Sequence, residues 1–158
     1  MRFEIMSEVM IRAMTLEDYD EVYALWQTIQ GFGIRSLDDS EEDIDRFLLR
    51  NPGISVVAEY KGNIIGNILC GHDGRQASFY HVCVAKEYRR QGIATKMAAF
   101  CMRRLQEIRI NKITLIAFSN NEGGNAFWKK VGWTSRNENV NYYEFVLNEN
   151  NITRFVKE

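Results

Sequence analysis

Long apolar runs and an excess of charge of either sign are both missing from this chain of 158 residues. No segment approaches the roughly 18–20 consecutive apolar residues that a membrane-spanning helix needs. The formal net charge is −1, so the chain lacks the basic excess that is typical of proteins that bind nucleic acid. The N-terminus has no apolar signal core. We therefore expect no membrane partner, no nucleic-acid partner and a cytoplasmic location.

Cysteine and proline are also scarce. The three cysteines, Cys70, Cys83 and Cys101, are an odd set without the spacing of a metal site. They are expected to be free thiols in a reducing compartment and to act as small buried hydrophobes. Hydrophobic residues make up 46% of the chain, which is enough for one core. We predict a single domain over residues 1–158, with 1–9 as an N-terminal extension and 148–158 as a loosely held tail.

Hydrophobic periodicity and turn residues predict alternating strands and helices. The helix 92–108 connects two strands that should lie parallel. Residues 61–63, Lys-Gly-Asn, are a hairpin signal between 54–60 and 64–70. The expected fold class is α/β (or α+β), with a mixed sheet and helices on both faces. The expected strands are 11–14, 54–60, 64–70, 77–84 and 113–118, with helices after 15–18 and 40–43, at 92–108 and 122–131, and a closing hairpin of 133–136 and 142–147.

Residues 82–95 form the most informative segment. A short apolar strand runs into a turn with Arg89, Arg90 and Gly92, and an amphipathic helix begins at once. The first N–H groups of a helix have no partner within the helix and carry a partial positive charge, which favours a phosphate. Gly92 lets the backbone approach an anion closely. The segment predicts a site for a pyrophosphate-bearing cofactor, but not an ATP-type loop, because no Gly-Lys-Ser/Thr follows Gly92.

Two motifs resemble those of the GNAT N-acetyltransferase superfamily. Arg89-x-x-Gly92-x-Ala94 is similar to its acyl-CoA pyrophosphate loop, and residues 121–133 are similar to its Asn-Glu-x5-Tyr-x-Lys-x-Gly-Phe segment. The element order agrees over about residues 10–147. Residues 71–75, Gly-His-Asp-Gly-Arg, resemble a small bacterial branch whose substrate is unassigned.

The resemblance implies a mostly antiparallel sheet that is splayed between its central parallel strands. It also implies acetyl-CoA as cosubstrate and no metal. Backbone N–H groups at the start of helix 92–108 would hold the pyrophosphate, and the strand before it would pair with the pantetheine amides. A backbone N–H near Val82 would stabilise the oxyanion. The cofactor-binding residues implied in this way are Val82, Cys83, Val84, Arg89, Arg90, Gln91, Gly92, Ile93, Ala94, Thr95, Asn121, Asn125 and Trp128.

Trp128 departs from the family pattern, in which many members have a tyrosine that protonates the leaving thiolate. An indole N–H cannot act as that acid. Either another tyrosine (Tyr80, Tyr142 or Tyr143) or water would supply the proton. The departure also leaves open a non-catalytic, acyl-CoA-binding regulatory module.

A general base must accept the proton of the attacking amine, directly or through water. His81 lies on the central strand beside the expected acetyl position, and histidine exchanges protons near neutral pH. Strand alternation puts His81 and Val82 on opposite faces, so His81 needs a bulge to turn it toward the site. Glu21, Glu59 and Tyr80 are rivals. The catalytic candidates are therefore His81, Tyr80 and Tyr143.

The acceptor pocket is expected between the first helix with its following loop, the loop 71–77 and the closing hairpin. Acidic residues there would hold an amine, and arginines would hold a carboxylate. The expected function is acetyl transfer from acetyl-CoA to a primary amine of a small molecule, by direct attack in a ternary complex. A protein N-terminus or lysine is the alternative acceptor, and a homodimer through the last strands is left open. The pocket candidates are Trp26, Phe32, Arg35, Asp38, Asp39, Asp73, Arg75, Tyr142 and Tyr143.

Overall fold

The computed structural model describes residues 5 and 7–157. Five strands form one sheet in the order β1-β3-β4-β5-β6. Every neighbouring pair is antiparallel except β5 and β6, which are parallel. This confirms the predicted mixed, mostly antiparallel sheet. The strands are β1 (Met10–Ala13), β3 (Val56–Tyr60), β4 (Asn63–His72), β5 (Ala77–Val84) and β6 (Ile113–Leu115).

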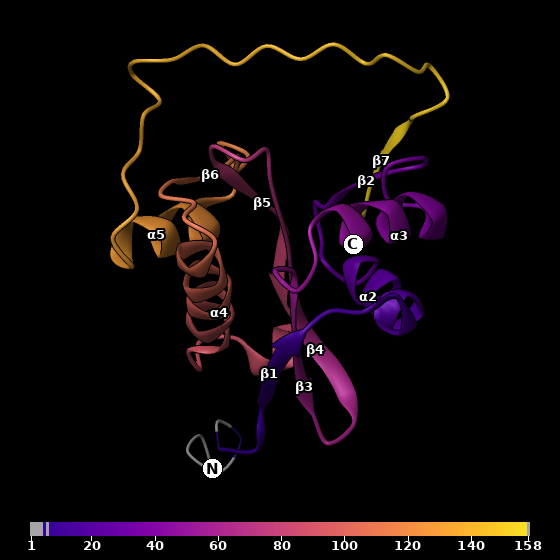
Figure 1. Ribbon diagram of the computed structural model, residues 1–158, viewed down its shortest axis with the longest axis vertical. Helices are drawn as coiled ribbons and strands as arrows, with labels where there is room; N and C mark the ends of the chain where they lie inside the picture. The colour runs from indigo at the N-terminus through magenta and orange to yellow at the C-terminus, as the bar shows by residue number, and fades with distance from the viewer. Residues whose placement is uncertain (1–4, 6, 158) are drawn as a thin grey trace.

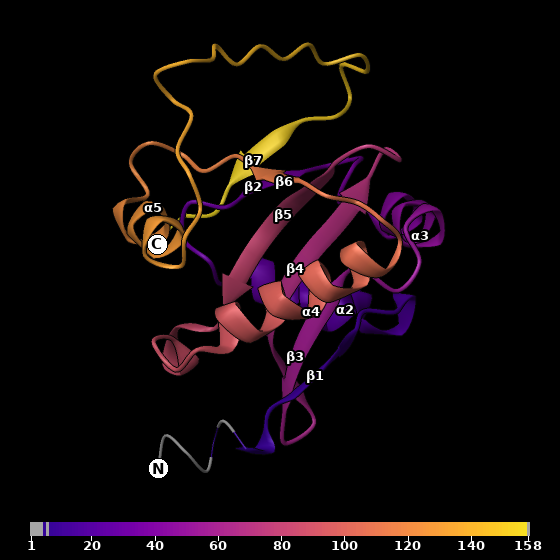
Figure 2. The ribbon, with the colours of Figure 1, turned by 60° about the vertical axis from the view of Figure 1, so that its left-hand side comes forward.

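Helices cover both faces of the sheet, as Figure 1 shows with the sheet on edge. The helices α4 (Ile93–Glu107) and α5 (Glu122–Lys130) lie on one side, and α2 (Tyr19–Trp26) and α3 (Glu41–Arg50) lie on the other. Figure 2 shows α4 crossing the face of the strands. Each side has its own apolar core, one under α4 and one under α2 and α3. None of the helices in the described part of the chain has the length and apolarity needed to cross a membrane.

Two of the predicted helix starts have the expected caps. Before α2, a short 3-10 turn, η1 (Leu16–Asp18), is closed by a bond from the backbone N–H of Thr15 to Asp18 Oδ2 at 2.9 Å. Before α3, Ser40 Oγ accepts from the backbone N–H of Asp43 at 3.2 Å. A second 3-10 turn, η2 (Lys86–Tyr88), precedes α4. Side-chain oxygens therefore satisfy donors at the starts of α2 and α3.

The predicted closing hairpin was wrong. Residues 133–136 and 142–147 form no strands, and the chain from α5 to the last strand runs as an extended segment across one end of the molecule (Figure 1). Tyr143, Phe145 and Leu147 on it are 85%, 86% and 95% exposed. The predicted strand 113–118 is also shorter, because β6 ends at Leu115. Residues 142–147 have the composition of a strand, but composition alone does not form one, because a strand also needs a partner to pair with.

The predicted loose tail was also wrong. Within 148–158, the strand β7 (Thr153–Phe155) pairs antiparallel with β2 (Gly33–Arg35) to form a second, two-stranded sheet. Asn151 Oδ1 accepts from the backbone N–H groups of Leu37 and Asp38, at 3.1 Å each. Residue 158, and residues 1–4 and 6 of the predicted N-terminal extension, lie outside the described residues. The tail thus fastens to the loop after α2, on the α3 side of the sheet.

Candidate active site

A bulge interrupts β5 in the middle of the sheet. The register with β4 pairs Leu69 with Tyr80 and then Asn67 with Cys83, so β5 has one extra residue at this point. His81 takes a φ of 51°, in the left-handed region that is uncommon for a residue other than glycine. Bulges of this kind redirect a side chain. A bulge is therefore present at His81, and it breaks the alternation between Tyr80 and His81.

The bulge places Tyr80 and His81 on the same side of the sheet. The Tyr80 ring lies edge-on to Phe47 of α3, with ring centroids 6.2 Å apart. The His81 ring lies 4.6 Å from Trp26 of α2. Val82 packs against the opposite core, under α4. The predicted opposition of His81 and Val82 is therefore confirmed.

His81 is enclosed by three side chains. Its ring stacks on Phe32 at 5.2 Å and tilts against Trp26. Its Nε2 atom lies 2.9 Å from Asp39 Oδ1, and the two side chains are 16% and 7% exposed. A histidine and a carboxylate from distant parts of the chain are thus held together in a nearly closed setting.

The neighbours of His81 are themselves fixed. Asp39 Oδ2 accepts from the backbone N–H of Arg35 at 2.7 Å, and the Tyr19 hydroxyl donates to the Asp39 carbonyl at 2.7 Å. Trp26 Nε1 donates to the buried Asn67 Oδ1 at 3.0 Å. Trp26 and Asp39 were predicted as candidates for the wall of the acceptor pocket, but both are buried. They support His81 instead, because the chain before α3 folds back over β5.

Beside the bulge, the pairing between β5 and β6 ends. Their parallel pairing runs from Ala77 with Ile113 to Phe79 with Leu115, and among the described residues it goes no further. On the β6 side, the edge of β5 over 80–84 therefore has no strand partner among the described residues. Exposed strand edges can accept an extended ligand as an additional strand. This is the splay that the sequence resemblance implied.

The start of α4 lies just beyond the C-terminal end of β5. Gly92 has a φ of 81° and no side chain to cap the helix, and Arg90 has a φ of 62°. The first backbone bond of the helix runs from Lys96 N to Gly92 O at 3.1 Å. The N–H groups of 93–95 therefore have no carbonyl partner within the helix. The first turn contains no acidic residue, so a negative charge from outside would meet an open set of donors.

The loop before α4 is tied to the sheet. Arg89 Nε donates to the carbonyl of Val84 at 3.0 Å, which holds the loop at the end of β5. Gln91 Oε1 is buried and has no hydrogen-bond partner among the described residues. Arg89 therefore has a structural role in addition to its charge. The loop also contains a buried acceptor, Gln91 Oε1, whose hydrogen bond the described residues do not supply.

The two predicted cofactor-binding asparagines shape the loop between β6 and α5. Asn121 Oδ1 caps α5 by accepting from Gly124 N at 3.0 Å, and Asn125 Nδ2 donates to the carbonyls of Phe118 and Asn121 at 3.0 and 2.9 Å. A Cβ on Gly124 would lie 2.4 Å from Nδ2 of Asn121, so this turn needs glycine. A role of these asparagines toward the cofactor stays a prediction.

Trp128 belongs to an aromatic cluster. Its ring lies 4.7 Å from Trp133, 4.9 Å from Phe127 and 6.3 Å from Phe79 of β5. The indole therefore packs α5 against the sheet, and an indole does not supply an acidic proton. Trp133, which precedes the extended segment, completes this cluster and anchors the segment at that end.

The tyrosine candidates differ in exposure and in the elements that carry them. Tyr80 is 49% exposed and contacts α3, whereas Tyr143 is 85% exposed on the extended segment. The Tyr142 hydroxyl donates to Glu144 Oε2 at 3.0 Å, and this hydrogen bond raises the pKa of Tyr142. Tyr143 is thus exposed, whereas the side chain of His81 is enclosed.

The cysteines are all buried and free. Burial raises the pKa of Cys83 to about 12, so this residue stays a neutral thiol at physiological pH. A hydrogen bond with Cys70, together with burial, raises the pKa of Cys101. Thiols of this kind are poor nucleophiles, which agrees with a reaction that forms no acyl-cysteine.

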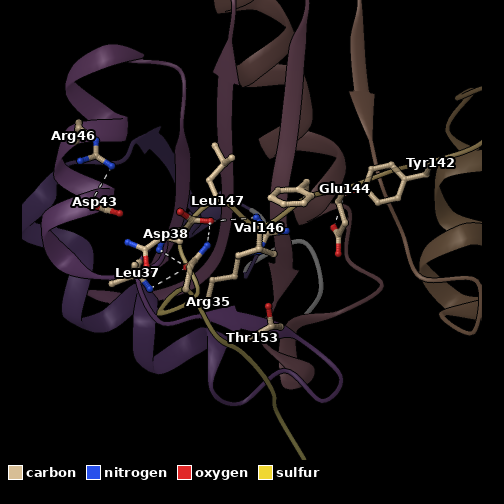
Figure 3. Close-up of a pocket in the computed structure, with 13 residues that line it drawn as sticks. Arg35, Leu37, Asp38, Asp43, Arg46, Tyr142, Glu144, Val146, Leu147 and Thr153 are labelled. Carbon is tan, nitrogen blue, oxygen red and sulfur yellow. Dashed lines mark hydrogen bonds and ion pairs between the residues drawn. The ribbon is translucent and has the colours of Figure 1, made fainter.

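A cavity of about 460 Å³ lies between α3, the loop before it and the extended segment (Figure 3). Arg35 pairs with Asp38 at 3.3 Å across its floor, and Arg46 pairs with Asp43 at 3.2 Å. Glu144 faces it from the extended segment. Three of the predicted acceptor residues, Arg35, Asp38 and Tyr142, line this cavity.

The loop 71–77 does not contribute to this cavity. Asp73 Oδ1 accepts from the backbone N–H groups of Arg75 and Gln76 at 2.8 and 2.9 Å. These hydrogen bonds lower the pKa of Asp73, and the bond from Gln76 has the larger effect. Asp73 therefore stabilises its own turn.

A comparison of the sequence with known protein families identifies the family of this chain. The acetyltransferase (GNAT) family matches residues 18–133, which is most of the chain. The chain belongs to the GNAT acetyltransferase family. It is therefore an acetyltransferase that uses acetyl-CoA, and the resemblance first seen in the two motifs is confirmed.

Relatives and solved structures support this assignment. An acetyltransferase of Photorhabdus laumondii is 32% identical over 130 residues, which cover 81% of this chain and 88% of that protein. A soil metagenomic aminoglycoside acetyltransferase, solved with sisomicin, has a similar fold (TM-score 0.71, 18% identity, 91% and 99% of the two chains covered). The PaiA N-acetyltransferase of Thermoplasma acidophilum, solved with coenzyme A, is also similar (TM-score 0.68, 16% identity, 78% and 88% covered).

Proposed function

We propose that this GNAT acetyltransferase transfers the acetyl group to a primary amine of a small molecule, by direct attack in a ternary complex, with His81 as general base. The observation that carries the proposal is the bulge, which directs His81 out of strand alternation. His81 lies on β5 just beyond the last residue that pairs with β6. The base would then lie beside the position where an extended thioester would pair.

The loop before α4 and the start of that helix would bind the pyrophosphate. Three backbone N–H groups at 93–95, the basic side chain of Arg90 and the absence of an acid in the first turn support this. Cys83 and Val84 are buried, so the strand would offer its backbone edge rather than these side chains to the pantetheine. The reactive carbonyl would then lie near the bulge, where the N–H of Val82 is suited to hold an oxyanion.

The proposed reaction has one bond-forming and one bond-breaking event. The amine nitrogen attacks the thioester carbon, and the C–S bond breaks as coenzyme A leaves as the thiolate. The proton of the attacking amine passes to His81, directly or through water. Trp128 cannot donate a proton to the thiolate, so we assign this proton to water, with Tyr80 at the bulge as the alternative donor. No covalent acyl-enzyme is formed, in agreement with the neutral, buried thiol of Cys83.

The cavity beside α3 supports a small acceptor. It is bounded on one side by the Arg35–Asp38 and Arg46–Asp43 pairs and on the other by the extended segment. Both arginines are already paired with acids, which leaves Glu144 as the additional charge at the cavity. An amine that carries a second positive charge fits this balance better than one that carries a carboxylate. The buried thiols are compatible with the cytoplasmic location that the sequence predicts.

An amine screen tests the function. The chain is incubated with acetyl-CoA and a panel of aminosugars, diamines, amino acids and short peptides, and thiol release is followed. We expect turnover with at least one small amine that carries two or more positive charges. Turnover of peptides alone would point to a protein acceptor. Tight coenzyme A binding without turnover of any amine would support a regulatory module and contradict the proposal.

Replacing the base tests the assignment of His81. For His81→Gln we expect kcat to fall by roughly 10²–10⁴-fold, the usual contribution of a general base. The affinity for coenzyme A should not change. The matched control is His72→Gln, since His72 caps a turn by accepting from Gly74 N at 3.0 Å. Unchanged kcat in His81→Gln would exclude His81 as the base.

A further inference from the structure

The carboxylate of Asp39 has both of its oxygens engaged by different groups. Oδ1 meets His81 Nε2 at 2.9 Å, and Oδ2 accepts from the backbone N–H of Arg35 at 2.7 Å. The side chain is buried and the Asp39 carbonyl is held by the Tyr19 hydroxyl. Asp39 is therefore fixed in position and orientation, and it faces a histidine in a strained backbone conformation. Strain of this type persists where the surroundings impose it, and it is found most often at functional sites.

We propose that Asp39 is a positioning residue that fixes the tautomer of His81 and thereby selects Nδ1 as the atom that accepts the amine proton. A carboxylate only accepts hydrogen bonds, so its partner Nε2 must carry the ring proton. The lone pair is then left on Nδ1, at the other side of the ring. A buried carboxylate can hold a catalytic imidazole in this way and also stabilises the imidazolium that forms. The inference rests on the proposed role of His81 as base.

The other neighbours of the ring do not compete for this role. Trp26 and Phe32 meet the imidazole with their aromatic faces and edges, and the Trp26 N–H is committed to Asn67. The charged side chain of Arg35 points instead to Asp38, at 3.3 Å. Among the described residues, Asp39 is the acidic group that the structure places in hydrogen-bond contact with His81.

The second oxygen of Asp39 determines what the substitution Asp39→Asn should do to the ring of His81. In Asp39→Asn, one of the two oxygens becomes an NH2 group. The backbone N–H of Arg35 can only donate, so the remaining oxygen must face Arg35 and the NH2 group must face His81. Nε2 must then accept, and the ring proton must move to Nδ1. The substitution is thus expected to reverse the tautomer and remove the lone pair from the atom that needs it.

Nitrogen-15 NMR of the two histidine rings tests this without any substrate. His72 Nδ1 accepts from a backbone N–H, so that ring is expected to carry its proton on Nε2 in every variant. His72→Gln assigns the signals. We expect the proton on Nε2 of His81 in the unsubstituted chain, on Nδ1 in Asp39→Asn, and still on Nε2 in the neighbouring control Asp38→Asn. A proton on Nδ1 in the unsubstituted chain, or no change in Asp39→Asn, would overturn the inference.

Kinetics test the consequence for the reaction. We expect kcat of Asp39→Asn to fall by about 10²-fold or more, with the coenzyme A affinity retained. The control is Glu42→Gln, which removes a charge from the exposed start of α3. A reversed tautomer with unchanged kcat would remove Asp39 from catalysis while the function stands. Failure of the unsubstituted chain to turn over any amine contradicts the proposed function, whereas the tautomer result still decides whether Asp39 controls the ring.

Discussion

The starts of α3 and α4 are opposite solutions to the same problem. α3 begins with the cap of Ser40 on the backbone N–H of Asp43, and three acids occupy its first turn. α4 begins with Gly92, which has no side chain, and its first turn has no acid. Both helix starts present unpaired N–H groups and a partial positive charge. The first is satisfied from within the chain, and the second is left for an anion from outside.

The difference teaches where to look for a ligand in a fold of this size. The turn η1 that leads into α2 is also closed from within the chain, because Asp18 accepts from the backbone N–H of Thr15 and also binds Arg12 at 2.7 and 2.8 Å. The start of α5 is capped by Asn121. α4, which packs on one face of the sheet, departs from this rule, because its first turn has neither a side-chain cap nor an acid. The buried oxygen of Gln91 beside it lacks a partner among the described residues. A helix start that is unsatisfied in this way indicates a binding site.

The largest expected effect is at α4. Gly92→Trp places a large side chain over the N–H groups and should weaken coenzyme A binding roughly 100-fold or more. That is the loss expected when two charge-assisted hydrogen bonds of about 1.5 kcal/mol each are removed. Calorimetry measures it. The control is Gly62→Trp in the β3–β4 turn, which has a similar φ of 80° and open space around it. Equal affinities in the two variants would contradict the comparison.

A smaller effect of a different kind is expected at α3. Ser40→Ala removes the cap and should lower the free energy of unfolding by about 1 kcal/mol. Urea denaturation measures the change. Coenzyme A affinity should stay the same, because this helix start has no role in the cofactor site. A loss of coenzyme A affinity in Ser40→Ala would contradict the claim that the start of α3 has no role in the cofactor site.

The smallest effect is expected when the pH is lowered and Asp18, just before α2, becomes protonated. Burial alone would raise the pKa of Asp18, but the hydrogen bonds from Arg12 and Thr15 outweigh it and lower the pKa. Ionised Asp18 therefore contributes stability above its unfolded pKa of about 4, and this is lost as the pH falls through the folded value. Stability curves between about pH 6 and pH 3 should be steeper for the unsubstituted chain than for Asp18→Asn. Asp20→Asn, at an exposed position, should keep the steep curve.

Local signals in the sequence were read correctly. Caps at Thr15 and Ser40, and the uncapped glycine at position 92, are encoded in a few consecutive residues, so the helices could be predicted. The cofactor site at the start of α4 stays a prediction. The order of elements then follows from short connections. The two GNAT motifs added the splay between β5 and β6, which composition alone does not reveal.

Pairings between segments that lie far apart in the sequence were not predicted correctly. Residues 142–147 have the composition of a strand, yet they pair with nothing among the described residues, whereas 153–155 has a weak signal and pairs with β2. Asp39 lies 42 positions from His81, and no local pattern links them. The site of the bulge had no signal either, since a φ of 51° at His81 depends on the register with β4. Such features arise from tertiary packing.

Titration of the nitrogen-15-labelled chain with coenzyme A, followed through its backbone amide signals, tests the central claim most directly. The account predicts that the largest shifts fall on the amides of 90–95 and that those of 41–43 stay in place. Small shifts over 90–95, with the largest changes at the start of α3 or α5, would contradict it.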